Sequence, residues 1–404
     1  METVYFKRND ISSAVFEITL CVTLIAYLVF ASSENRINNK YYGLVGGVSF
    51  VYMLVLLIAF FHGGNNSVLS NMLQKIVIFC ALLPLFLLVL KKKGFGYVKT
   101  VLLVRYVNTF CVFTFVGFML WILDAIGISL PTISVPFTWG GSRVGDGILG
   151  LTFNITLSDQ AFSQGLYRFT FLLVEGPFAI SYFALAAIIE MSCNKYPRFY
   201  IVLFLTICIV CSFTGFGMLM AAPVLVLGLL TSQKVKKVMH GSPIAFFGYG
   251  IALFSLVIFA PLISIGLLEQ KDNTSSTSLH IADFIGGFRA FKDSPLLGFG
   301  IGNYSPLHYY SDNGIAGTSS ALMMGVVQGG LLFVLSVLLP LLGAFFNACI
   351  NDQFRFALLP LFAIIFYVNG LTDNSPIFPF IISICIYYLT NERKVDKISE
   401  MVIY

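Results

Sequence analysis

The chain has 404 residues, of which 58% are hydrophobic and only 11% are charged. A soluble domain carries about 25% charged residues, and no single soluble core buries so much apolar surface. The composition therefore excludes a disordered chain, a nucleic-acid-binding protein and an ordinary soluble enzyme. It predicts a chain dissolved in a lipid bilayer, where each helical span needs about 20 apolar residues.

Apolar runs recur along the whole chain. Each is predicted to be a helix, because backbone inside a bilayer must satisfy its own hydrogen bonds. The expected fold is all-α: a polytopic integral membrane protein in a single domain, 1–404, with about eleven or twelve transmembrane helices. The pair 199–212 and 214–231 is expected to form two short spans broken near Ser212–Gly217. The other runs are 11–31, 41–61, 72–90, 100–127, 169–190, 243–268, 319–346, 356–371 and 376–390.

The basic connectors predict the orientation, because Lys and Arg concentrate in cytoplasmic loops. The clusters in 91–99, 234–237 and 393–397 are therefore placed inside. The C-terminus is then inside and the N-terminus outside. Basic residues near the N-terminus argue mildly against placing that terminus outside. Two long segments, 128–168 and 268–318, face outward in this arrangement.

The cytoplasmic connectors are each about ten residues long. A nucleotide-binding domain takes at least about 50 residues, so none fits on this side. Any chemistry is expected at the outer face. Its energy must arrive already attached to the substrate or come from an ion gradient.

Standard site motifs are missing from the sequence. It contains no phosphate-binding Gly-x-x-x-x-Gly-Lys-Ser/Thr, no His-Glu-x-x-His and no Asp-x-Asp, and its four His are scattered. No metal and no cofactor are therefore expected. Gly298-Phe-Gly300-Ile-Gly302 resembles a phosphate-cradling run, but no strand is expected before it, and a tight turn is the favoured reading.

The second outer segment predicts an interfacial helix near 280–292. Asp283 falls opposite an apolar stripe and Arg289 flanks it, so the helix is expected to lie flat in the outer interface. Arg289 is then either a snorkelling side chain or a clamp on a lipid-linked phosphate, for which its planar fork is suited. The stripe consists of Ile281, Phe284, Ile285, Phe288 and Phe291.

The first outer segment supplies three further candidates. Arg168 ends it, and Glu175 follows within the next apolar run, where a central charge costs about 2.5–3.5 kcal/mol. Arg143 is a weaker candidate. The alternative reading of Arg168 and Glu175 is an interfacial charge pair.

Three other charged residues lie in or near the apolar runs. Arg105 and Asp124, in one run, are interpreted as structural. Asp373 is a polar candidate beside the expected outer cavity.

Several of these segments together resemble the bacterial O-antigen polymerase and O-antigen ligase family of polytopic glycosyltransferases. The resemblance covers about 160–345. It rests on Arg168 followed by Glu175-Gly-Pro177, on Ser212-Phe-Thr-Gly215, on Ser294-Pro-Leu-Leu-Gly298-Phe-Gly-Ile-Gly-Asn303-Tyr304, and on Val327-Gln-Gly-Gly330-Leu-Leu at the opening of the next span.

Two departures from the family pattern concern basic residues. His280 stands where members often carry an arginine, and Arg289 is a possible substitute. Thr318-Ser319 stands where members, ligases especially, often carry His-Asn, which favours polymerase over ligase; His308 lies upstream and is an alternative.

The resemblance implies a GT-C-type fold in the bacterial inner membrane with the active site facing the periplasm. The implied substrate is a polyprenyl-pyrophosphate-linked oligosaccharide, transferred onto the next lipid-linked repeat unit. Arg168, Arg289 or His280, and more weakly Arg143, would neutralise the pyrophosphate, and Glu175 or His308 would act as base.

Other partners and functions remain open. Membrane lipid surrounds the chain, and a membrane protein that regulates chain length is a further partner. The alternatives are an O-antigen ligase, which transfers the polymer to lipid A-core, and an oligosaccharide-lipid flippase or ion-coupled transporter.

Overall fold

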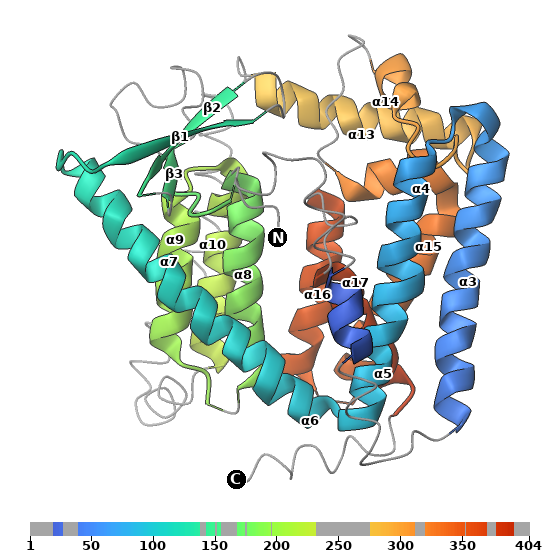
Figure 1. Ribbon diagram of the computed structural model, residues 1–404, viewed down its shortest axis with the longest axis horizontal. Coiled ribbons are helices and arrows are strands. Elements are labelled where there is room, and N and C mark those ends of the chain that lie inside the picture. The colour runs from blue at the N-terminus through green and yellow to red at the C-terminus, as the bar shows by residue number, and fades with distance from the viewer. Residues whose placement is uncertain are drawn as a thin grey trace. The chain divides into compact units, whose positions relative to one another are not determined.

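The computed structural model describes residues 19–26, 39–137, 143–149, 152–154, 168–173, 176–194, 196–231, 275–311, 320–351, 353–369 and 377–391. They fall into two compact units. The first unit holds the described residues within Val101–Asn273, and the second unit holds those within Ala14–Thr100 and Thr274–Tyr404. Both units are mainly helical (Figure 1).

Among the described residues, four helical stretches are long and apolar enough to cross a membrane: Tyr41–Asn66, Leu69–Lys93, Phe95–Ala125 and Ala321–Ile350. Shorter apolar helices accompany them, at Phe178–Cys193, Phe199–Cys211, Met220–Leu229, Phe354–Val368 and Ile377–Leu389. A multi-pass membrane protein is the fold class that these lengths support. The expected run 243–268, most of 11–31, and Asp373 lie outside the described residues.

The second unit is a helical bundle with a capping layer. Its long helix α3 (Asn39–Gly63) packs beside a continuous run made of α4 (Leu69–Lys75), a π-helical segment (Ile76–Leu82) and α5 (Leu83–Lys93). Helices α13 (Ser275–Asp293) and α14 (Ser305–Tyr310) lie across one end of this bundle (Figure 1). The unit also contains α6 (Phe95–Val98), α15 (Ala321–Ile350), α16 (Phe354–Asn369) and α17 (Ile377–Leu389), a 3₁₀ turn at Gly64–Asn66, and helical residues at 19–26.

The π-helical segment of the second unit has a local cause in the sequence. Pro84 has no backbone N–H to donate to the carbonyl four residues earlier, that of Cys80. That carbonyl instead accepts a 2.9 Å hydrogen bond from the Ser49 hydroxyl of α3. The freed backbone group is therefore satisfied by a neighbouring helix, as a bilayer requires.

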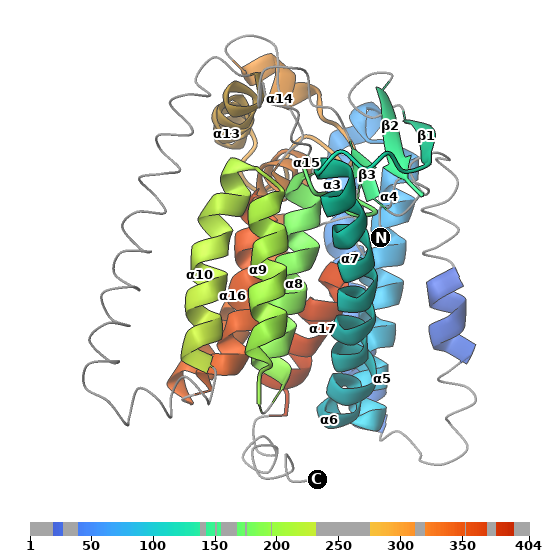
Figure 2. The same cartoon turned by 90° about the vertical axis from the view of Figure 1, so that its left-hand side faces the viewer.

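The first unit places α7 (Val104–Ala125), which follows a π-helical turn at Lys99–Leu103, beside three shorter helices. These are α8 (Gly176–Cys193), α9 (Phe199–Cys211) and α10 (Gly215–Thr231), which stand side by side in Figure 2. The break predicted near Ser212–Gly217 is confirmed. It lies at 212–214, where Phe213 has a positive φ of 45°.

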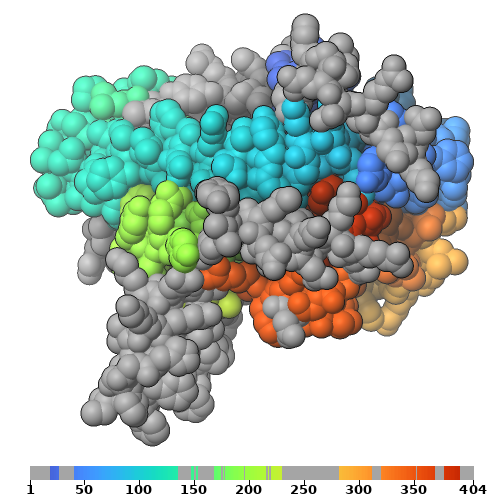
Figure 3. Space-filling view, turned by 90° about the horizontal axis from the view of Figure 1, so that it is seen from below, coloured from blue at the N-terminus to red at the C-terminus, as the bar shows by residue number. Residues whose placement is uncertain are grey.

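The helices of the first unit expose large apolar side chains. Val112, Phe113 and Phe115 of α7 are 63%, 53% and 50% exposed, and the side chains of α7 form a ridge along the face shown in Figure 3. A soluble monomer rarely exposes so continuous an apolar surface, whereas lipid solvates it without cost.

The all-α expectation is wrong for the first outer segment. Strands β1 (Thr132–Phe137), β2 (Arg143–Ile148) and β3 (Thr152–Asn154) form an antiparallel sheet in the order β1-β2-β3. The sheet docks on α7 where the Thr152 hydroxyl donates to the Gly117 carbonyl at 2.8 Å. Outside the membrane the backbone can pair between strands, and a search for long apolar runs does not detect such short strands.

A buried ion pair ties α8 to α9. Glu190 is fully buried, and its carboxylate accepts two side-chain hydrogen bonds from Arg198, at 2.9 and 2.7 Å, and a third from the Arg198 backbone N–H at 2.8 Å. These bonds raise the pKa of the Arg198 guanidinium. A buried charge is tolerated here because a bidentate partner satisfies both carboxylate oxygens.

Candidate functional site

The helix predicted near 280–292 is present as α13, and its two faces differ sharply. Phe288 of the apolar stripe is 57% exposed, and Phe284 is exposed as well. The opposite face packs against α14 and α15 through Asp283, Gly286 and Ala290, which are buried. Asp283 therefore faces the protein rather than water, because small neighbours on its face let other helices approach closely.

Arg289 and His308 are brought into one helical pair, the cap formed by α13 and α14. The Arg289 guanidinium donates a 3.1 Å hydrogen bond from Nη1 to the carbonyl of Tyr310, at the end of α14. His308 lies two residues earlier on α14, and both side chains are exposed. The structure thus places two of the predicted site residues, both exposed, on two neighbouring helices.

A second contact fastens the two helices of the cap together. The Tyr310 hydroxyl donates to the Asp293 carboxylate at the end of α13. This hydrogen bond raises the pKa of Tyr310 above its ordinary value. Tyr310 therefore contacts the last turn of α13 twice, through its carbonyl to Arg289 and through its hydroxyl to Asp293.

Next to the cap, the segment Pro295–Gly302, which contains the glycine run, pairs with Val327–Leu332, where α15 is interrupted; we name this pairing the glycine clasp. It consists of four backbone hydrogen bonds, two donated by each segment. The amide N–H groups of Phe299 and Gly300 donate to the carbonyls of Val327 and Gln328, at 2.7 and 3.1 Å, and those of Leu331 and Leu332 donate to Pro295 and Leu296, at 2.8 and 3.2 Å.

The clasp fixes where α15 breaks. Gly330 has φ 58° and ψ −158°, a conformation that is essentially restricted to glycine. The sequence places Val327–Gly330 at the opening of a span. In fact α15 begins at Ala321, where the Ser320 hydroxyl caps it by accepting from Met323 N–H, and the interruption at Gly330 divides it.

The glycine run is a turn and not an open phosphate cradle. Its amides already donate within the protein: Gly298 to the Ser294 carbonyl, Phe299 and Gly300 across the clasp, and Gly302 to the Gln328 side chain. A phosphate-binding loop needs free N–H groups that point at the anion. The reading as a tight turn is therefore supported.

Gln328 and Lys75 are two buried polar residues that sequence reasoning did not assign to a site. Gln328 is 1% exposed and accepts from Gly302 N–H at 3.2 Å. Lys75 is 2% exposed, and its ammonium lies 5.2 Å from the centre of the ring of Phe333, the residue that directly follows the clasp. The available signal for Lys75 was a lone cation inside the apolar run 72–90, which is costly in a membrane and suggests a role.

The remaining predicted residues lie elsewhere or outside the described part. Arg168 belongs to the first unit and is half-buried, and the next amide, of Phe169, donates to the Cys211 carbonyl at 2.9 Å. Arg143 lies in β2 opposite Phe137. His280 lies on α13. The side chains of Arg143 and His280, and the whole of Glu175, lie outside the described residues.

The expected position of Glu175 within a helical span is not supported by its neighbours. Residues 168–173 are not helical, and α8 begins only at Gly176. The apolar run 169–190 therefore starts with an irregular segment. Phe169 and Phe171 in this segment are buried, so they are apolar because of packing and not because they span a bilayer as a helix.

Within the described ranges, no three His, Cys, Asp or Glu side chains come together as a metal site would require. Comparisons with models of known protein families, with curated proteins and with solved structures found no match. The resemblance to the O-antigen polymerase and ligase family therefore rests on the sequence motifs alone.

Proposed function

We propose that this protein is a glycosyltransferase of the bacterial inner membrane that polymerises O-antigen at the periplasmic face. Its donor is a growing chain on polyprenyl pyrophosphate, and its acceptor is the next lipid-linked repeat unit. The observation that carries the proposal is the cap of the second unit, where an exposed arginine, Arg289, stands beside the exposed aromatic side chains Phe284 and Phe288.

The cap combines what a lipid-linked pyrophosphate needs. The aromatic side chains suit the apolar side of the interface, and a guanidinium at headgroup level grips phosphate through two parallel hydrogen bonds. The glycine clasp holds the cap on the end of the bundle of the second unit. Arg289 is therefore already in position before the substrate binds, and binding does not have to supply the entropic cost of ordering it.

The proposed reaction exchanges one bond for another at the anomeric carbon of the donor sugar. The bond to the pyrophosphate oxygen breaks, and a bond to an acceptor hydroxyl oxygen forms. Arg289 neutralises the charge that develops on the departing polyprenyl pyrophosphate. His308, on the other helix of the cap, takes the acceptor proton, and no metal enters this scheme.

The test is a gel of cell-surface polysaccharide from a deletion strain complemented with variants. Wild type is expected to restore the ladder of long chains, and Arg289→Ala to lose it at unchanged membrane level. Lys292→Ala is the matched control, because Lys292 is an exposed cation three residues further along α13. Arg289→Lys is expected to rescue poorly, since the planar fork is lost.

The same gel distinguishes the competing functions. One repeat unit on the core in the deletion strain indicates a polymerase, whereas lipid-linked polymer with nothing on the core indicates a ligase. Accumulation of units on the inner leaflet indicates a flippase. An unchanged ladder in the deletion strain, or in the Arg289→Ala strain, contradicts the proposal.

A further inference from the structure

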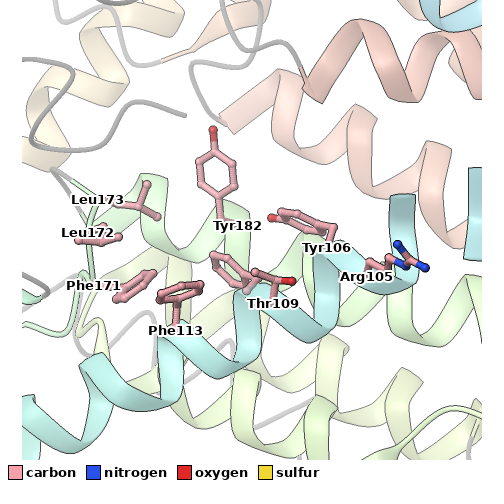
Figure 4. A pocket seen from close by; sticks show the side chains of 9 residues that line it. Arg105, Tyr106, Thr109, Phe113, Phe171, Leu172, Leu173 and Tyr182 are labelled. Carbon is pink, nitrogen blue, oxygen red and sulfur yellow. The ribbon is translucent and has the colours of Figure 1, made fainter. Parts of the chain in front are cut away.

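The first unit contains a groove that the proposed glycosyl transfer does not use. It has a volume of about 440 Å³, within the range of about 300–1,000 Å³ that ligand sites occupy. It runs along α7 and is closed on the other side by α8 and the irregular segment before it. Its lining residues are Arg105, Tyr106, Thr109, Phe110, Phe113, Phe171, Leu172, Leu173 and Tyr182 (Figure 4).

The groove is apolar along most of its length and polar at one end. Figure 4 shows the residues of the 171–173 segment at one end, Phe113 and Thr109 in the middle, and Arg105 at the other end. Phe113 belongs to the exposed ridge of α7, so the groove is continuous with the surface that we expect lipid to cover. Its walls suit a hydrocarbon chain that enters from the bilayer.

The polar end of the groove lacks a partner among the residues that the structure describes. Arg105 makes no hydrogen bond or ion pair with any residue in the described part of the chain. The Tyr106 hydroxyl, on the next residue, points along the groove away from Arg105 (Figure 4); it is buried, and it likewise finds no hydrogen-bond partner among those residues. A cation and a hydroxyl donor on a membrane helix are costly without acceptors, and the phosphate and ester oxygens of a phospholipid supply an acceptor for each.

We propose that the groove binds one anionic phospholipid of the cytoplasmic leaflet, with its phosphate at Arg105 and an acyl chain along Phe110 toward Leu173. The leaflet follows from the basic connector: Arg105 comes six residues after Lys99, at the end of α7 that the charge distribution places inside. Basic pockets between helices on this side of a membrane are suited to anionic headgroups. The inference goes beyond the proposed function and does not depend on it.

The test is native mass spectrometry of the full-length protein released from nanodiscs that contain phosphatidylethanolamine and phosphatidylglycerol. Wild type is expected to retain one phosphatidylglycerol in preference to phosphatidylethanolamine. Arg105→Ala is expected to lower that preference about five- to tenfold, because one charge-assisted contact is lost. Arg105→Lys is expected to keep part of it.

Two further variants separate the headgroup from the chain. Thr109→Trp fills the groove but leaves Arg105 in place, and it is expected to lose the bound lipid of either headgroup. Asn108→Ala is the control, because Asn108 is exposed on α7 but does not line the groove. Even if Arg105→Ala fails to fold, Arg105→Lys and Thr109→Trp still test the site.

Three results overturn the proposal: equal retention by wild type, Arg105→Ala and Thr109→Trp; no preference of wild type for the anionic headgroup; or recovery of polyprenyl phosphate in place of phospholipid. Polysaccharide ladders from the same variants keep this test apart from the proposed function. Lipid loss with a normal ladder supports the groove as a separate site.

Discussion

The two units hold their irregular segments in opposite ways. In the second unit the glycine clasp joins a loop to a broken helix through backbone hydrogen bonds, with almost no side chains between them. In the first unit the irregular segment 168–173 has one backbone hydrogen bond to another element, from Phe169 to Cys211, and is held mainly by ring packing. Phe169 stacks on Phe183 with centroids 5.6 Å apart and meets Phe118 edge-on at 5.2 Å.

This difference has a physical origin and a consequence. Backbone groups in a membrane must be bonded, and in the clasp Gly298 and Gly330 leave room for the opposing backbone, which an added Cβ would meet at 2.6 and 2.5 Å. Aromatic rings instead fill volume through dispersion contacts that tolerate small shifts. We therefore expect a single methyl group added within the clasp to lower the free energy of unfolding strongly. A smaller apolar side chain in the aromatic packing should lower it less.

The largest effect is expected for Gly330→Ala. A Cβ here would lie 2.5 Å from the Leu296 carbonyl carbon, and the backbone conformation disfavours any side chain. Strain and overlap together should cost about 3 kcal/mol or more, enough to lose most folded protein. The measurement is the yield of monodisperse protein in detergent.

The control for that variant is Gly47→Ala on α3, where an added Cβ has nothing within 4 Å. This variant should behave as wild type. If Gly330→Ala were also to yield wild-type amounts of monodisperse protein, the clasp would not fix α15 as described.

A smaller loss is expected for Gln328→Met, which keeps the side-chain volume but removes the acceptor of Gly302 N–H. Leaving that amide unsatisfied in a buried site should cost about 1–3 kcal/mol. Thermal unfolding followed by intrinsic fluorescence in detergent is the measurement. A melting temperature equal to that of wild type would show that the backbone bonds alone hold the clasp.

For the aromatic side of the comparison, Phe169→Leu is expected to cost only about 1–1.5 kcal/mol. The variant loses the ring contacts with Phe183 and Phe118 but keeps a buried apolar side chain. The same melting experiment applies. A loss larger than that of Gly330→Ala would reverse the contrast between the two units.

The smallest effect is expected for Tyr310→Phe, at the exposed edge of the cap. Its hydrogen bond to Asp293 raises the pKa of Tyr310, so the bond contributes fully below the ordinary tyrosine pKa of about 10 and is lost as pH rises through the raised value. The small difference in melting temperature between variant and wild type should therefore be present at neutral pH. If the difference in melting temperature persisted well above the raised pKa, it would come from packing of the Tyr310 ring and not from the hydrogen bond.

Much of the helical layout could be predicted because long apolar runs have one stable form in a bilayer. The break before Gly215 and the helix over 280–292 follow from such patterns. The predicted tight turn at Gly298–Gly302 also follows from local glycine chemistry.

The sequence did not predict features that depend on contacts between distant segments. The bonding of Gly300 to Gln328 joins two loops that periodicity treats separately. The strands of 132–154 are too short and too polar for a search based on apolar runs. The irregular start of the run 169–190 was not predicted, because buried aromatic residues in a loop give a sequence that is as apolar as a membrane span.

The central claim is that the cap carrying Arg289 faces the outside of the cell. A single cysteine at Tyr309, which is 81% exposed on α14, tests it directly in a background without the native cysteines. A membrane-impermeant maleimide should label Tyr309→Cys in cells with an opened outer membrane and an intact inner membrane, and should label Lys92→Cys only after the inner membrane is broken. Labelling of Tyr309→Cys only after inner-membrane rupture would contradict the account.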